Sequence, residues 1–430
     1  MSTIAFITLG CKTNQFETQA MELLCRDRGL TVVDPDQPAD IYIVNSCAVT
    51  SNAGKKSRQE LHAARRRNPS ALIAVCGCYA ELAREELISS GDADVVSGNK
   101  DHQAFLDAVL EKEKTLVMSE EKAASFENLP AGNLAGRTRA LLKIEDGCTN
   151  FCAYCIIPYL RGRVRSIDPA FAESEVRRLS AEGFREIVLT GIEIASYGLD
   201  LPDKPTLADL ILRLSSAAGD TRLRLGSLEP RTVTEDFCRK LAPLSNLCPH
   251  FHLSLQSGCD TVLRRMGRKY DTALFTEVVE RLRRTFPNAA VTTDIITGFP
   301  GETDEEFQTT CDFCEKIRFD KVHVFPYSIR TGTRAARMEN QIPRAEKERR
   351  ARVLGRLTAA ISEEVLNREI GREAVVLFES EENGVTSGYT ENYHLFTLPE
   401  SGLTGRVARV RIEKVDDHAL TGHILAFLHE

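Results

Sequence analysis

Residues 145–155 read Glu-Asp-Gly-Cys-Thr-Asn-Phe-Cys-Ala-Tyr-Cys, and this stretch decides how the fold is interpreted. It directly follows an apolar run at 140–144 that predicts a β-strand, so Cys148, Cys152 and Cys155 (the central trio) lie in the loop after that strand. A cubane iron–sulfur cluster normally takes four cysteines, so a C-x3-C-x2-C triplet leaves one iron open to a ligand from outside the protein. An open metal position is typical of a catalytic site. The alternative, a structural zinc site, would need a second cysteine or histidine clip at a suitable distance, and the sequence contains none.

Composition indicates a globular protein with more than one hydrophobic core. The chain has 430 residues, of which 42% are hydrophobic and 27% are charged, and this length predicts two or three domains. The formal net charge of −7 gives no global sign of nucleic-acid binding. We expect no membrane span and no secretory signal, because long apolar runs and a basic N-terminal segment are lacking. Thirteen cysteines in such a chain favour metal or catalytic use in a reducing cytoplasm.

The alternation of strand and helix patterns predicts an α/β fold with three domains. Residues 1–118 have the pattern of a doubly wound α/β domain, and residues 119–136, acidic and then rich in Gly, Asn and Pro, are interpreted as a linker. Residues 137–370 contain six strand–helix units, too few for a closed eightfold barrel, so we predict an open, partial (β/α)6 barrel that ends in a long charged helix at 344–368. Short strands over 371–430 predict a small closed β barrel.

A second set of cysteines lies in the N-terminal domain. Cys11, Cys47 and Cys78 (the N-terminal trio) each follow a predicted strand. The carboxyl ends of parallel strands meet at one edge of a doubly wound sheet, where ligands bind, so these three residues are expected to converge. Burial as a small apolar residue is the alternative for any one of them. Cys76 could substitute as a ligand, although burial explains it more simply.

With these two trios, the chain resembles the methylthiotransferase family of radical S-adenosylmethionine enzymes. The resemblance runs along essentially the whole chain. Its motifs are TLGCKTNQ (8–15), NSCAVT (45–50), GCYA (77–80), RGR (161–163), LSLQSGCD (253–260), TGFPGET (297–303) and FPYS (325–328).

The resemblance implies two [4Fe-4S] clusters with different tasks. The cluster held by Cys148, Cys152 and Cys155 would bind S-adenosylmethionine and cleave it reductively to a 5′-deoxyadenosyl radical. The cluster held by the N-terminal trio would carry the sulfur that is methylated and transferred. The resemblance further implies a C-terminal TRAM module that binds RNA or substrate, and three partners: a tRNA, an electron donor and a sulfur donor.

Cofactor contacts within the barrel are expected at the carboxyl ends of its strands. Glu193 follows a strand and is the candidate for the cofactor's amino group, while Arg161 lies just past the central trio, where it could contact cofactor or tRNA phosphate. Each polar residue has an alternative role in a turn, a cap or a solvated surface. The other candidates are Gln256, Ser257, Asp294 and Gly298.

Three details resemble the MtaB-type branch, whose target is C2 of threonylcarbamoyladenosine at position 37, beside the tRNA anticodon. They are Cys259 after QSG, SLEPR (227–231) and GYTENY (388–393); the isopentenyladenosine branch usually has Ser in place of Cys259. Isopentenyladenosine in tRNA and a ribosomal-protein aspartate are the alternative targets. An iron–sulfur RNA-binding protein without catalysis is the alternative from another class.

Local basic clusters give RNA binding some separate support. The triplet at 65–67, six Arg or Lys within 344–356 and the basic residues of 406–414 could contact phosphates, and Tyr389 and Tyr393 could stack on bases. Single-stranded loops such as an anticodon loop are recognised in this way, and the target base must leave its stack. The alternative is that these charges only keep the surface solvated.

Overall fold

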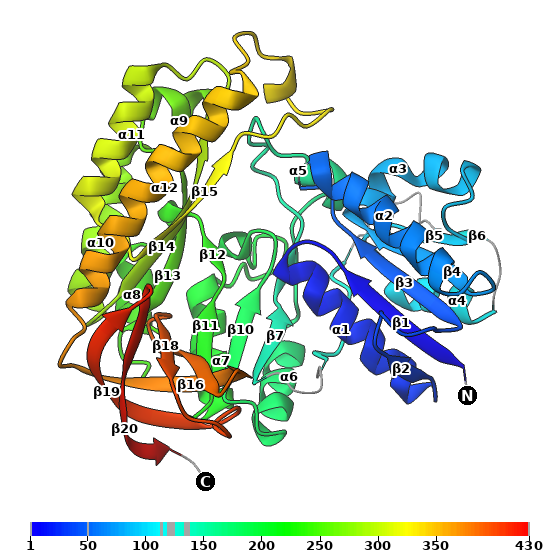
Figure 1. Cartoon of the computed structure of the whole chain (residues 1–430), viewed down its shortest axis with the longest axis horizontal. Coiled ribbons are helices and arrows are strands. Elements are labelled where there is room, and N and C mark those ends of the chain that lie inside the picture. The colour runs from blue at the N-terminus through cyan, green and yellow to red at the C-terminus, as the bar shows by residue number, and fades with distance from the viewer. Residues whose placement is uncertain (1, 50, 112–114, 118–124, 133–137, 429–430) are drawn as a thin grey trace.

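A computed structural model describes residues 2–49, 51–111, 115–117, 125–132 and 138–428 (Figure 1). An N-terminal α/β domain, a central partial barrel and a C-terminal β barrel follow one another along the chain, and this α/β architecture confirms the prediction. Within the described residues, no helix is both long and apolar enough to span a membrane.

The N-terminal domain is built on a six-stranded parallel sheet with the order β2-β1-β3-β4-β5-β6. The strand order reverses between β1 and β3, as in other doubly wound sheets. The central strand β3 is buried at every position, as expected for a parallel sheet covered on both faces. The elements are β1 (Thr3–Thr8), α1 (Lys12–Asp27), β2 (Thr31–Val33), β3 (Ile41–Ser46), α2 (Ser51–Arg67), β4 (Leu72–Gly77), α3 (Cys78–Ser89), β5 (Val95–Ser97), α4 (His102–Glu111) and β6 (Thr115–Val117).

The predicted linker is described in part, and that part is packed. Leu129 and Ala131 are fully buried in the core of the central barrel, together with Phe16 of α1. The segment 125–132 therefore fills the interface between the two α/β domains; residues 119–124 and 133–136 of the predicted linker lie outside the described residues.

The central domain is a partial barrel of parallel strands that confirms the predicted (β/α)6 pattern. Gly226 separates β11 from β12, and counting these two as one gives six strand positions in the described residues. The strands are β7 (Arg139–Lys143), β10 (Glu186–Thr190), β11 (Arg222–Leu225), β12 (Ser227–Leu228), β13 (His250–Gln256), β14 (Ala290–Thr297) and β15 (Lys321–Pro326); a two-stranded ribbon of β8 (Glu145–Asp146) and β9 (Arg165–Ser166) follows β7.

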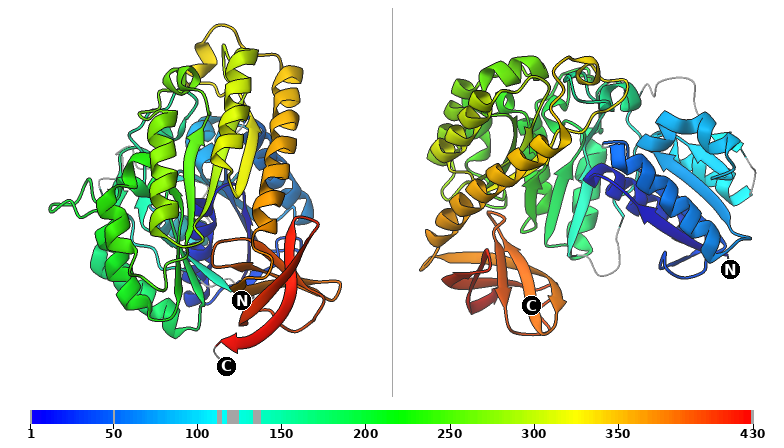
Figure 2. Two further views of the ribbon diagram at one scale, coloured as in Figure 1. Left: turned by 90° about the vertical axis from the view of Figure 1, so that its left-hand side faces the viewer. Right: turned by 45° about the horizontal axis from the view of Figure 1, so that its top comes forward.

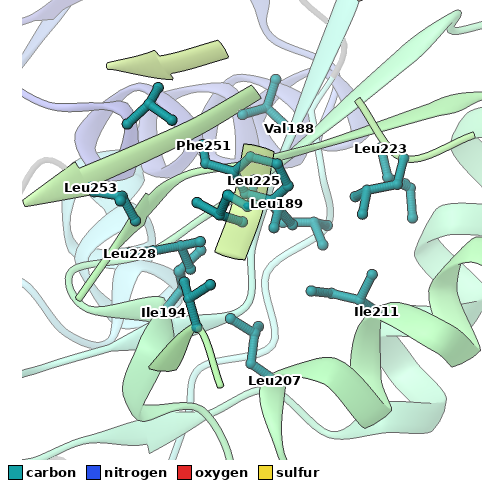
Figure 3. Close-up of a cluster of buried hydrophobic side chains, with 14 of the residues drawn as sticks. Val188, Leu189, Ile194, Leu207, Ile211, Leu223, Leu225, Leu228, Phe251 and Leu253 are labelled. Carbon is teal, nitrogen blue, oxygen red and sulfur yellow. The ribbon is translucent and has the colours of Figure 1, made fainter. Parts of the chain in front are cut away.

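Helices cover the outer face of this barrel, and the N-terminal domain lies on its open side (Figures 1 and 2). Figure 3 shows part of this core, where Leu189 and Leu225 of the strands lie on the side of Leu207 and Ile211 of α7, and Val188 points to the other side of its strand. The helices are α5 (Ile157–Arg161), α6 (Pro169–Ala181), α7 (Leu207–Ala218), α8 (Glu235–Leu241), α9 (Asp260–Met266), α10 (Thr272–Thr285), α11 (Asp304–Ile317) and α12 (Arg344–Asn367), with short 3-10 turns η1 (Ile194–Ser196), η2 (Pro230–Thr232) and η3 (Ala335–Arg337).

The C-terminal strands close into the predicted small barrel, in the order β16-β17-β18-β20-β19. This barrel docks at the amino ends of the central strands, since Arg139 of β7 pairs with Glu379 at 2.6 Å and Arg222 of β11 donates to the carbonyl oxygen of Val375 at 3.0 Å. Its strands are β16 (Glu373–Glu382), β17 (Val385–Thr390), β18 (Leu395–Leu398), β19 (Val407–Asp416) and β20 (Ala419–Leu428).

Candidate iron–sulfur and cofactor site

The N-terminal trio gathers at one edge of its sheet. Cys11 follows β1 and precedes α1, Cys47 follows β3, and Cys78 begins α3 directly after β4. These three strands are neighbours in the sheet, and Cys11 lies within electrostatic range of both other thiols. Gly10 has φ +106°, and a Cβ built there would lie only 2.9 Å from the Sγ of Cys47. A glycine is therefore required for the two strand ends to approach this closely.

Buried surroundings favour the protonated thiols of Cys47 and Cys78. Burial raises the pKa of Cys47, and it raises the pKa of Cys78 to about 12. Because a metal binds the thiolate, metal binding here must release protons. Asn14 of α1 joins the two loops by donating to the carbonyl oxygens of Leu9 and Ser46, both at 3.0 Å. A cavity of about 610 Å³ opens beside Cys47 and the start of α2.

The central trio occupies the loop between β8 and α5, where all three thiols are half-buried. Gly147 precedes it with φ +88°, and a Cβ there would lie 2.0 Å from the carbonyl oxygen of Arg163, so only glycine lets the loop fold back. Burial raises the pKa of Cys148 to about 12 and that of Cys155 to about 11.

The donors around the central trio suit an iron–sulfur cluster. The backbone N–H of Asn150 donates to the Sγ of Cys148 at 3.4 Å, and Arg268 donates to the Sγ of Cys152 at 3.2 Å. Thiolate sulfur is a soft ligand typical of iron–sulfur and zinc sites, and hydrogen bonds to sulfur tune iron–sulfur clusters. All thirteen cysteines are free thiols, and among the described residues no three Cys, His, Asp or Glu side chains form a ready-made metal site.

Glu193 is the cofactor candidate nearest to the central trio. It follows β10 and accepts a hydrogen bond from the side-chain amide of Asn150 at 3.3 Å, within the cluster loop itself. Burial raises the pKa of Glu193 to about 7, so a cationic partner would stabilise the charged form of its carboxyl. Gln256 ends β13 with φ +72°, an unusual backbone conformation for a residue other than glycine. Asp294 on β14 is 34% exposed and lies 3.4 Å from His252.

Two other candidates have structural roles. Ser257 is buried, and its hydroxyl accepts the N–H of Cys259 at 3.2 Å, as in a turn. Gly298 has φ +68°, and a Cβ there would lie 2.5 Å from the Cγ of Lys347 on α12. Its role is to let the end of β14 pack closely against α12.

Arg161 is buried, whereas a contact with RNA phosphate would require it to be at the surface. It is 0% exposed, and its guanidinium donates to Glu17 at 2.8 Å, to Asp146 at 3.1 Å and to Asn14 at 3.0 Å. It also hydrogen-bonds the thiol of Cys78. The short helix α5 turns Arg161 back into the interface between α1 and β8, beside Cys78 of the N-terminal trio.

Lys143 and Arg165 also belong to this buried ion cluster, which sequence reasoning missed. The ammonium of Lys143 lies 3.1 Å from Glu17 and 3.3 Å from Asp146. Burial opposes the charge of Glu17, but Arg161 and Lys143 outweigh burial and hold the pKa of Glu17 at about 2. Glu17 therefore stays charged at neutral pH within this buried ion cluster.

Two arginines beside the trios were also missed. Arg268, which donates to Cys152, is packed over the ring of Tyr270 at 4.8 Å. Arg330, from the loop after β15, is buried within electrostatic range of Cys47 and Cys78. Among 55 lysines and arginines, no spacing in the sequence distinguishes these two.

The basic clusters are less available to RNA than the sequence suggests. Arg65 pairs with Asp94 at 2.6 Å, and Arg350 of α12 is buried against Glu302 at 2.8 Å. Other arginines of α12 pair with glutamates of the same helix, and Arg411 of β19 pairs with Glu373. Tyr389 and Tyr393 also differ from the expectation, because both rings lie against Arg139 of the central barrel.

Comparisons with known proteins agree with this arrangement. Residues 142–314 match the Radical SAM superfamily, and residues 3–98 match the Uncharacterized protein family UPF0004. The threonylcarbamoyladenosine tRNA methylthiotransferase MtaB of Bacillus subtilis (strain 168) is 38% identical over 96% of this chain and 94% of its own length. The tRNA-2-methylthio-N(6)-dimethylallyladenosine synthase of Clostridium botulinum (strain Loch Maree / Type A3) is 33% identical over 96% and 95%.

A solved structure shares the fold at low sequence identity. The radical S-adenosylmethionine methyltransferase TsrM from Kitasatospora setae, with cobalamin and a [4Fe-4S] cluster bound, superposes with a TM-score of 0.57. The match covers 76% of this chain and 72% of that chain at 15% identity.

Proposed function

This chain belongs to the methylthiotransferase family of radical S-adenosylmethionine enzymes, and we propose that it adds a methylthio group to C2 of threonylcarbamoyladenosine 37 in tRNA. Membership of the radical SAM superfamily implies S-adenosylmethionine and a [4Fe-4S] cluster. We propose that Cys148, Cys152 and Cys155 hold this cluster and that the N-terminal trio holds a second one. The observation that carries the proposal is that the N-terminal trio meets at one sheet edge, where the buried Arg161 hydrogen-bonds Cys78 and also binds Asp146, two residues before Cys148.

The clusters, when bound, supply reductive cleavage of S-adenosylmethionine at the central trio and the transferred sulfur at the N-terminal trio. The chain's own residues position and tune these reactants. Arg268 donates a hydrogen bond to the sulfur of Cys152, which favours the reduced state of an attached cluster by placing positive charge beside it. Glu193, oriented by Asn150, is placed to receive the ammonium group of the cofactor's methionine part, which would hold Glu193 in its charged form.

Sequence similarity supports the choice of substrate. The MtaB relative is more similar to this chain than the dimethylallyladenosine synthase, at 38% against 33% identity over comparable lengths. We propose tRNA as a partner on this basis, with an electron donor for cofactor cleavage and a sulfur donor to replace the transferred atom. A tRNA substrate also favours a cytoplasmic location.

The central experiment separates the two trios. We would reconstitute the protein anaerobically with iron and sulfide, add dithionite, S-adenosylmethionine and tRNA, and measure 5′-deoxyadenosine and the methylthio product by mass spectrometry. Cys152→Ala should abolish 5′-deoxyadenosine release, whereas Cys47→Ala should retain it and lose the methylthio product. Each variant should also lose about one cluster's iron.

Cys76→Ala is the matched control for these variants. Cys76 precedes Cys78 by two residues but is buried in the apolar core with Ile4 and Phe6, so its replacement should leave both products and the iron content intact. Methylthio product from Cys47→Ala, or loss of RNA affinity alone in both trio variants, would contradict the two-cluster assignment. Activity on isopentenyladenosine tRNA, with none on threonylcarbamoyladenosine tRNA, would move the enzyme to the other branch.

A further inference from the structure

A second cavity lies where all three domains meet, beside the start of α1. It has a volume of about 260 Å³ and is lined by Lys12 and Gln15 of α1, Arg139 of β7, Val188 of β10, and Glu379 and Tyr393 of the C-terminal barrel. Figure 1 shows α1 and the C-terminal barrel approaching β7 from different sides. We call it the junction cavity. Lys12, which lines the junction cavity, directly follows Cys11 in the sequence.

One wall of the junction cavity is a fixed stack of rings. Tyr393 is parallel to Tyr389 at 4.5 Å between centroids and stacks on His250 at 4.8 Å. Arg139 lies 5.4 Å from the ring of Tyr393, and Arg224 lies 4.7 Å from it. Arg139 also hydrogen-bonds the hydroxyl of Tyr393. The ring is thus held from several sides, and its hydroxyl and the adjacent cations form the polar edge of the cavity.

The cavity carries more positive than negative charge. Glu186 is held by Arg224 at 2.7 Å and by Arg222 at 2.9 Å, and Glu379 is held by Arg139 at 2.6 Å. Both carboxylates are therefore engaged directly by arginines, and Glu186 acts on Lys12 only as a more distant charge. The cations of this region are Lys12, Arg139, Arg222 and Arg224, and its carboxylates are Glu186, Glu379 and Glu391. An excess of one positive charge in a partly enclosed space suits one anionic group.

We propose that the junction cavity binds the carboxylate of the threonyl group on the substrate nucleoside, with Lys12 as the residue that distinguishes this substrate. The inference rests on the proposed function. C2 and C6 of adenosine flank N1, and C6 carries the N6 substituent, so a residue adjacent to a ligand of the sulfur-carrying cluster can reach the substituent while C2 faces that cluster. An isopentenyl group has no charge, and it would leave Lys12 facing no anionic group of the substrate.

Binding of matched RNAs tests the assignment. Fluorescently labelled anticodon stem-loops, one with threonylcarbamoyladenosine and one with isopentenyladenosine, are titrated with reconstituted enzyme. The wild type should prefer the first by about tenfold or more, as expected for hydrogen bonds to a charged group. Lys12→Gln should bind both RNAs with nearly equal affinity, and Lys12→Arg should restore part of the preference. Lys316→Gln, at an exposed position on the outer helix α11, is the matched control and should behave as the wild type.

The outcomes separate this inference from the proposed function. A wild type without preference for the threonylcarbamoyl RNA overturns the proposed substrate. A wild-type preference that persists in Lys12→Gln overturns the role of Lys12 alone. Iron analysis checks that the loop of Cys11 is intact in Lys12→Gln. If that variant loses iron, Tyr393→Phe decides instead: it removes a hydroxyl from the cavity and should weaken the preference several-fold, and an unchanged preference overturns the proposal.

Discussion

Replacing Arg161 with methionine should destabilise the folded protein by about 3 kcal/mol. Arg161 and Glu17 are both 0% exposed, and the guanidinium lies 2.8 Å from Glu17 and 3.1 Å from Asp146. Removing one partner of a buried ion pair typically costs about 3–5 kcal/mol, because the other charge stays buried without compensation. Lys143 still lies 3.1 Å from Glu17 and 3.3 Å from Asp146 after the change. We therefore expect a loss at the lower end of that range.

Urea unfolding followed by circular dichroism measures this loss, since the chain contains no tryptophan to report by fluorescence. Arg344→Met is the matched control, because Arg344 pairs with Glu348 at 2.7 Å but its side chain is 91% exposed. An exposed pair contributes little, so the control should unfold as the wild type does. Glu17→Gln combined with Arg161→Met should recover part of the lost stability, because the charge left behind is then removed. Equal midpoints for Arg161→Met and Arg344→Met would refute the reasoning.

Three further changes test the electrostatics and the loop geometry. Burial lowers the pKa of His102, but the Glu127 carboxylate 2.7 Å away outweighs burial and raises this pKa. The pair therefore stabilises the folded protein fully below about pH 6.5, and its contribution is lost as the pH rises through the raised pKa. In urea unfolding, His102→Gln should cost more stability near about pH 6 than near about pH 9. Burial raises the pKa of Glu145 well above its usual range. The wild type therefore loses stability as the pH rises above about 4.5, because the unfolded chain releases this proton first. In the same assay, Glu145→Gln should be more stable than the wild type between about pH 5 and 8. Gly147→Ala places a Cβ 2.0 Å from the carbonyl oxygen of Arg163 and should lose iron and 5′-deoxyadenosine release together, whereas retention of both would show that the loop tolerates the methyl group.

Much of the fold could be predicted because its strands are long, apolar and regularly spaced. The central strands β3 and β4 are almost wholly buried, and buried parallel strands appear in a sequence as apolar runs. The strands β2 and β6 were missed because each has three residues at an edge of the sheet, too few to form a pattern. The packing of 125–132 could not be predicted for a related reason, since Leu129 and Ala131 are isolated apolar residues that only the tertiary fold buries.

Cysteine positions could be predicted, but the partners of charged residues could not. The parallel direction of β1, β3 and β4 brings Cys11, Cys47 and Cys78 to one edge, and the alternation of strands and helices in the sequence predicts that direction. Whether an arginine is free or paired depends on contacts between residues far apart in the chain. Arg161 pairs with Glu17 across 144 positions, and Arg268 meets Cys152 across 116. No local pattern carries that information.

The buried ion cluster explains how two domains can hold two trios in one fixed arrangement. A purely apolar interface between α1 and β8 would be at least as stable, because desolvation of buried charges offsets much of their attraction. It would, however, tolerate sliding, since apolar contacts have no direction. The planar guanidinium of Arg161 donates to acceptors on Glu17, Asp146 and Asn14. Its donors point in fixed directions, so these hydrogen bonds form in only one position of α1 relative to β8. Asn14 lies three residues from Cys11, and Asp146 lies two residues from Cys148. We infer that the buried ion cluster serves to fix the position of the two trios and not to add stability. A shift in register at Arg161 would move one trio relative to the other.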